Sequence, residues 1–176
     1  LRDGLVGLLR VGKPVVCQMA RRLPNQRAGF LSRRDRLEQH LIKNDNFDEK
    51  VKQTLPQLWL PFIKDDTPII LDLSDIAKPL AKKMDYLATV RDGSTGQLVN
   101  GYWLMEMYAS ISHKNPIPIH LEAFSHEHPT CMGQNPVVID AVRRVFQITG
   151  NRGVLVIDRG GDAGVFFHDW LEHQYR

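Results

Sequence analysis

The sequence has few cysteines and no long apolar run, and these two absences exclude several classes of protein. Its two cysteines, Cys17 and Cys131, form no Cys-x-x-Cys pair in a chain of 176 residues, so a disulfide framework is not expected. No apolar segment approaches the roughly 20 residues that a transmembrane helix needs. Together these features predict a protein of the reducing cytoplasm that has no membrane partner.

Motifs of other binding and enzyme classes are missing as well. The turn-like segment 91–96 lacks the Gly-Lys-Ser/Thr ending of a phosphate-binding P-loop, and no serine lies in a nucleophile elbow. His126, His128 and Cys131 lie close together, but no second pair of ligands stands at the spacing of a structural zinc site. We therefore expect a loop at residues 125–131 and exclude nucleotide binding by a P-loop.

Charge is distributed unevenly along the chain. Residues 1–43 contain ten Lys and Arg against three Asp and Glu, a net charge of +7; the whole chain carries +3, so the remainder carries −4. Such an asymmetry is typical of a basic region that binds a polyanion, and a solvated helical surface is the alternative. Apolar spacing predicts helices through residues 1–60, among them a capped, arginine-rich helix from Ser32 to near residues 44–46.

From Pro68 onward the pattern changes to short, β-branched apolar runs that predict strands. The order strand, strand, strand, helix, strand, helix predicts an α/β fold with a mixed sheet. We expect two regions, a basic helical region at 1–64 and a sheet domain at 65–176. The strands are expected at 69–72, 102–111, 117–124 and 154–157, and the helices at 137–149 and 164–174.

Two aspartates follow apolar runs directly. Asp72 closes the run 68–71, and Asp158 closes the run 153–157. The end of a strand holds a carboxylate rigidly, and paired hard oxygen ligands suit Mg²⁺ or Mn²⁺ and phosphoryl transfer. The alternative is that each aspartate is a strand-end cap or turn former, and Asp75 is a second choice for the first ligand.

Three separate stretches are similar to motifs of DDE transposases of the bacterial insertion-sequence type. The first catalytic motif of that family resembles IILDLSDIAKP (69–79), and the segment after it resembles VRDGSTGQLVNGY (90–102). The second motif, an apolar strand that runs into Asp-Arg-Gly, resembles VLVIDRGGDAG (154–164). The family's amino-terminal DNA-binding part resembles RRDRLEQHL (33–41). The element order also resembles the ribonuclease H-like fold, in which carboxylates on the first and fourth strands meet at one end of the sheet.

This resemblance implies a DNA transposase that cleaves and transfers strands at transposon ends, with Asp72 and Asp158 as catalytic ligands of Mg²⁺ (or Mn²⁺). It also implies a third acidic residue, a glutamate on a later helix, which we expect beyond Arg176 rather than at Glu172. The chain is accordingly expected to be a segment of a longer protein. The implied partners are double-stranded DNA, as transposon ends and target, and a second copy in a synaptic homodimer.

Two other functions stay open at this point, a non-catalytic DNA-binding or inhibitory transposase fragment and a nuclease of the same fold. Each function requires cations that contact DNA phosphates, which give affinity without sequence choice. The predicted DNA contacts are Arg33, Arg34, Arg36, Lys78, Lys82, Lys83, Arg91 and Arg159.

Overall fold

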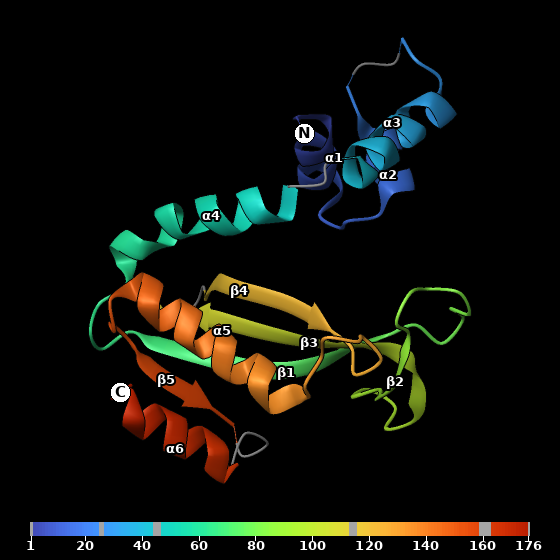
Figure 1. Ribbon diagram of the computed structural model, residues 1–176. Coiled ribbons are helices and arrows are strands. Elements are labelled where there is room, and N and C mark those ends of the chain that lie inside the picture. Colours follow the sequence, from blue (N-terminus) through green and yellow to red (C-terminus); the bar gives the residue numbers. More distant parts are fainter. Residues whose placement is uncertain (1, 25–26, 44–46, 113–115, 159–162, 176) are drawn as a thin grey trace. The chain divides into compact units, whose positions relative to one another are not determined.

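The computed structural model describes residues 2–24, 27–43, 47–112, 116–158 and 163–175 (Figure 1). Its contacts divide the chain into two compact units, Leu1–Lys52 and Gln53–Arg176, whereas the sequence predicted a boundary between residues 64 and 65. The division falls earlier because the second half of α4 (Phe47–Trp59) belongs to the core beneath the sheet. Trp59 and Ile63 lie in that core, each only 1% exposed, on either side of the short 3₁₀ helix η1 (Leu60–Phe62).

The first unit is helical, as predicted. Its described residues form α1 (Arg2–Val11), α2 (Val16–Arg22) and the arginine-rich α3 (Phe30–Ile42). Their apolar faces share a small core made of Met19, Ala20, Leu23 and Leu37. The helices α1 and α2 approach so closely at Gly7 that a Cβ there would lie 2.8 Å from the Cβ of Met19. A helical pair this close tolerates only the smallest residue at the contact.

The second unit is built on a mixed, open sheet of five strands within the described residues. The strand β1 (Pro68–Ala77) lies between β3 (Leu98–Ala109), to which it is antiparallel, and β5 (Val154–Ile157), to which it is parallel. The other edge of β3 pairs with β2 (Ala88–Arg91) and then with β4 (Ile117–Phe124). The α/β class and the mixed sheet predicted from the sequence are therefore confirmed.

Two expectations about the strands were wrong. The first strand does not end at Asp72; it continues to Ala77, because β3 supplies pairing partners as far as Gly101. The strand β2 was missed, since its four residues run straight into the Asp-Gly-Ser-Thr turn and resemble the edge of a loop. The predicted strands at 117–124 and 154–157 were placed correctly and are β4 and β5. Because β2 was not predicted, β5 is the fourth strand of the sequence prediction.

Two helices, α5 (Gln134–Thr149) and α6 (Gly164–Glu172), cover the same face of the sheet (Figure 1). The helix α5 is amphipathic, with Val138, Val142 and Phe146 fully buried against Met105 and Met107 of β3, as expected for apolar residues at spacings of three and four. An ion pair between Arg143 and Asp169 joins the two helices. None of the described helices is long and apolar enough to cross a membrane.

Gly101 is predicted to be irreplaceable for steric reasons. It pairs with Ala77 on one side and Ala88 on the other, and an added Cβ would lie 2.5 Å from the Ile76 carbonyl oxygen and 2.6 Å from Val90 Cγ2. Gly101→Ala should therefore lower the free energy of unfolding by about 3 kcal/mol. The measurement is urea unfolding followed by tryptophan fluorescence, because all three tryptophans lie in the second unit.

Gly164→Ala is the matched control. An added Cβ at this first residue of α6 meets no atom within 4 Å, so its stability should stay within about 0.5 kcal/mol of the wild type. Equal losses in both variants would contradict the steric argument.

Candidate acidic site on the open face of the sheet

The structure brings the two predicted aspartates to adjacent positions on neighbouring strands. The last paired residues of β1 and β5 are Leu71 and Ile157. Asp72 follows Leu71 in the chain, and Asp158 follows Ile157. Paired strands lie about 4.8 Å apart, so the backbones of the two aspartates start from neighbouring positions. Asp72 lies within β1 and Asp158 just beyond β5, and both side chains are exposed.

Alternation along the strands places this acidic pair on the face opposite the helices. Ile69 and Leu71 point into the core, and therefore Ile70 and Asp72 point away from it. Val156, the register partner of Ile70, lies on the same open face. Asp158 follows Val156 by two residues, just beyond the end of β5, and is exposed, which fits the same face. Ile70, Val156 and Leu121 are 37%, 42% and 59% exposed, so helices α5 and α6 leave this face uncovered.

A third carboxylate, Glu106, lies directly opposite Asp72 on β3. Like charges at opposed positions of an antiparallel pair repel each other. Two hydroxyl groups offset part of this cost by donating to the Glu106 carboxylate, from Tyr108 Oη at 2.8 Å and from Ser74 Oγ at 3.4 Å. Glu106 is therefore held in place beside Asp72 by hydroxyl donors.

The negative charge of this face also affects Tyr108. Its pKa is raised above the ordinary value of 10.0, chiefly by its hydrogen bond to Glu106 and then by burial, with smaller contributions from the charges of Glu106 and Asp72. A phenol among carboxylates resists ionisation, because its anion would add to the same charge. Tyr108 therefore stays a hydrogen-bond donor throughout the physiological range.

The oxygen donors on this face fit a divalent cation in part. Asp72 and Asp158 are hard oxygen ligands at adjacent positions, which suits Mg²⁺ or Mn²⁺ as far as two ligands can. Within the described residues, however, no group of three or more His, Cys, Asp or Glu is placed to hold a metal ion. The site thus offers a pair of ligands, and the third acidic residue that the family resemblance implies stays a prediction.

The other acidic and metal-ligand candidates lie elsewhere. Asp75 accepts a hydrogen bond from the Gly93 backbone at 2.9 Å and so fastens β1 to the turn before β3. Glu172 is exposed at the last residue of α6. His126 packs edge-on against Trp103 and Phe124, and His128 packs against Tyr86, an arrangement of ring contacts after β4.

The predicted DNA contacts of the second unit are all at the surface where they are described. Lys78, Lys82, Lys83 and Arg91 are exposed, and none of them pairs with a carboxylate among the described residues. Arg159 lies outside the described residues. These five assignments stay predictions.

The three predicted contacts on α3 differ from one another. Arg33 is only 9% exposed, on the face that also carries Leu37, and its Nε and Nη1 have no hydrogen-bond partner in the described part of the chain. Arg34 pairs with Asp35 and Glu38 on its own helix, and Arg36 pairs with Asp3 of α1 at 2.5 Å. The α3 arginines are therefore partly engaged within the unit.

Neither the comparison with family models nor that with curated proteins found a match to this chain.

Glu106 and Tyr108 are the site residues that the sequence reasoning missed. They stand in the run YWLMEMYA, where alternation of polar and apolar residues is visible at Met105, Glu106, Met107 and Tyr108. That alternation already placed Glu106 and Tyr108 on one face of a strand. The position of Glu106 opposite Asp72 could not be inferred from the sequence, because the register between β1 and β3 is set by the whole sheet.

Tyr108→Phe is predicted to cost about 1 kcal/mol of unfolding free energy at neutral pH, the usual contribution of one hydrogen bond. Because the folded pKa of Tyr108 is raised, this contribution is fully present below the unfolded pKa near 10. It is lost as the pH rises through the higher folded value. Urea unfolding of both proteins from neutral to alkaline pH measures the difference.

Glu106→Gln provides the control for the cause of the shift. Removal of this carboxylate charge should bring the pKa of Tyr108 back toward 10.0. The measurement is an ultraviolet titration of tyrosine in the wild type and in Glu106→Gln, with Tyr108→Phe identifying the signal of Tyr108. An unchanged titration in Glu106→Gln would show that burial, not Glu106, determines the behaviour of the phenol.

Proposed function

We propose that this chain contains part of a metal-dependent DNA strand-transfer site, of the kind found in DDE transposases. The observation that carries the proposal is the adjacency of Asp72 and Asp158 on the open face of the sheet, directly after the paired residues Leu71 and Ile157. These are the two aspartates of the transposase-like motifs in the sequence. They lie far apart in the chain, so their meeting is a property of the fold.

The strand arrangement supports a ribonuclease H-like fold as the finer description. Three long strands, β4, β3 and β1, are successively antiparallel, and β5 adds beside β1 in the parallel direction after the helix α5. In that fold, carboxylates of the first and fourth strands meet at one end of the sheet, and β1 and β5 correspond to those strands here. The hairpin strand β2 is an addition to this plan.

Each residue of the site has a distinct task in the proposed chemistry. A divalent cation, when bound, supplies activation of an oxygen nucleophile and neutralises charge at the reacting phosphate. Asp72 and Asp158 provide the hard oxygen ligands from two paired strands, so their spacing is fixed by the sheet. Glu106, held by Tyr108 and Ser74, raises the negative charge beside Asp72 and so favours a cation on this face.

A second candidate is a non-catalytic DNA-binding or inhibitory transposase fragment. It is favoured by one observation, that the described residues place no group of three metal-ligating side chains together. Two carboxylates bind a divalent cation more weakly than three, and Mg²⁺ prefers a nearly ideal octahedral shell. A chain of this kind would bind DNA without cutting it, whereas a nuclease of the same fold would cut DNA without strand transfer.

The test removes one carboxylate at a time. Asp72→Asn and Asp158→Asn should each weaken Mn²⁺ binding, measured by the spin-resonance signal of the free ion, by about tenfold or more. We expect the wild-type chain to nick supercoiled plasmid in the presence of Mg²⁺, and each variant to lack this activity. The reason is that each variant replaces one of only two anionic ligands.

Asp75→Asn is the matched control, because it removes the same charge from the same strand while Asn can still accept the hydrogen bond from Gly93. It should bind Mn²⁺ and nick DNA like the wild type. If Asp75→Asn lost metal and Asp72→Asn kept it, the assignment of the first ligand would be wrong. Metal binding without nicking by the wild type would favour the non-catalytic candidate.

A further inference from the structure

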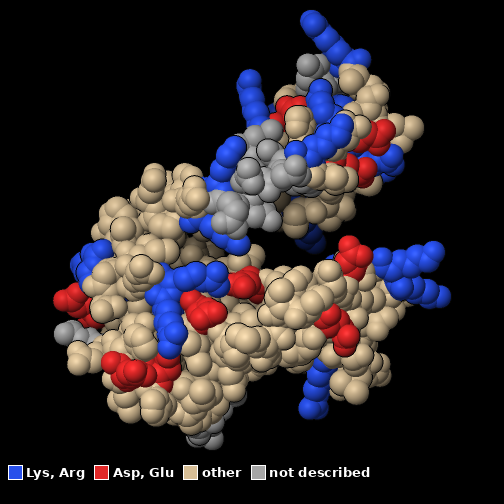
Figure 2. Space-filling view, in the orientation of Figure 1, with Lys and Arg blue, Asp and Glu red and all other residues tan. Residues whose placement is uncertain are grey.

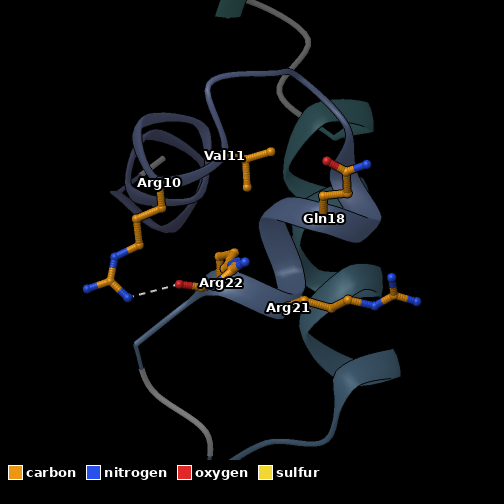
Figure 3. A pocket seen from close by; sticks show the side chains of 5 residues that line it. All are labelled: Arg10, Val11, Gln18, Arg21 and Arg22. Atoms are coloured by element: carbon orange, nitrogen blue, oxygen red, sulfur yellow. Dashed lines mark hydrogen bonds between the residues drawn. The ribbon is translucent and has the colours of Figure 1, made fainter.

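A pocket of about 370 Å³ lies within the first unit, between the end of α1 and the helix α2 (Figure 3). Three of the five residues that line it are arginines, Arg10 from α1 and Arg21 and Arg22 from the last turn of α2; the other two are Val11 and Gln18. In the close view Arg10 and Arg21 extend to opposite sides, with Arg22 between them. The pocket is thus surrounded by positive charge.

The arginines of this pocket have hydrogen-bonding capacity left over. Arg10 donates from Nη1 to the Arg22 backbone carbonyl at 2.9 Å, which satisfies a carbonyl at the C-terminus of α2. The Arg21 Cζ atom lies 5.1 Å from the centre of the Phe30 ring, a cation–π contact with the first residue of α3. Since a guanidinium has five N–H donors, these two contacts leave donors of Arg10 and Arg21 that can bind a ligand.

The charges of these arginines are also not neutralised from within. Among the described residues no carboxylate pairs with Arg10, Arg21 or Arg22, whereas Arg34 and Arg36 of α3 both form ion pairs. Figure 2 shows Lys and Arg side chains projecting from several sides of this unit. The pocket therefore differs from the α3 pair Arg34 and Arg36 in that its three arginines have no acidic partner among the described residues and line one concavity.

We propose that this α1–α2 pocket, rather than the arginine-rich helix α3, is the main phosphate-binding surface of the first unit, and that its ligand is the backbone of duplex DNA. Arginine donors in a fork geometry bind phosphate oxygens well, and pairing with phosphates supplies affinity independent of sequence. Gln18 adds a neutral side chain that can donate to a phosphate oxygen at the same site. The identity of the partner as DNA rests on the proposed function; the phosphate-binding surface does not.

The experiment compares two double variants of the full chain that lose the same charge. Arg21→Gln/Arg22→Gln removes two cations from the pocket and leaves the Arg22 carbonyl in place, whereas Arg34→Gln/Arg36→Gln removes two paired cations from α3. Binding of a short, fluorescein-labelled DNA duplex is followed by anisotropy between about 50 and 200 mM salt. No divalent cation is added, so neither cleavage nor the acidic site contributes to the result.

The pocket variant should bind the duplex about tenfold or more weakly at low salt, and the slope of log affinity against log salt should fall by about 2, one for each arginine. The α3 variant should change both quantities much less. Arg21→Lys/Arg22→Lys should retain most of the slope, which separates a loss of charge from a loss of folding. Circular dichroism of all three variants checks their helix content.

Three outcomes would overturn the inference. Equal losses in the two glutamine variants would mean that charge anywhere on the unit suffices, and a larger loss in the α3 variant would assign the DNA surface to α3. Titration with inorganic phosphate distinguishes a site for a free phosphate ion from a surface for the DNA backbone. If the pocket variant lost phosphate binding but kept its affinity for the duplex, the pocket would be a small-anion site and not a DNA surface. Because nicking is not measured, failure here leaves the acidic site untouched.

Discussion

The parallel pairing of β1 with β5 is the constraint on which the candidate site depends. Ile69 pairs with Leu155 and Leu71 with Ile157, and the burial of Ile69 and Leu71 fixes which face of β1 is turned inward. A slip of one residue would expose Leu71 and bury Asp72, at the cost of both an apolar and a charged group. The core therefore determines where the carboxylates point, although none of its residues takes part in the chemistry.

The open face of the sheet combines charge with apolar surface in an unusual way. Asp72 and Glu106 oppose each other without a basic residue between them, and hydroxyl groups from Ser74 and Tyr108 moderate the repulsion. The first unit has the opposite character, because its residues 1–43 carry a net charge of +7. The rest of the chain, residues 44–176, carries a net charge of −4.

How much of this could be predicted depended on the range of the interactions. The short apolar runs before Asp72 and Asp158 predicted that each aspartate follows a buried strand, whereas only the resemblance to the ribonuclease H-like fold implied that the two would meet. The true end of β1, the strand β2 and the role of Glu106 were not, because each depends on pairing partners that lie far away in the chain. Likewise Arg36 gave no sign of its ion pair with Asp3, which lies on another helix. Local patterns indicated the elements, and only the tertiary register indicated their neighbours.

The long connection between β1 and β5 has a consequence for how the protein folds. A parallel pair cannot be closed by a tight turn, and here the hairpin strands, β4 and the whole of α5 must be traversed before β5 reaches β1. Contacts between residues so distant in sequence are slow to form, because the chain loses the entropy of the long loop before the contacts contribute any stabilisation. The antiparallel pairs β2–β3 and β3–β4 are closed by short connections, whereas Asp72 and Asp158 become neighbours only once β5 has paired with β1.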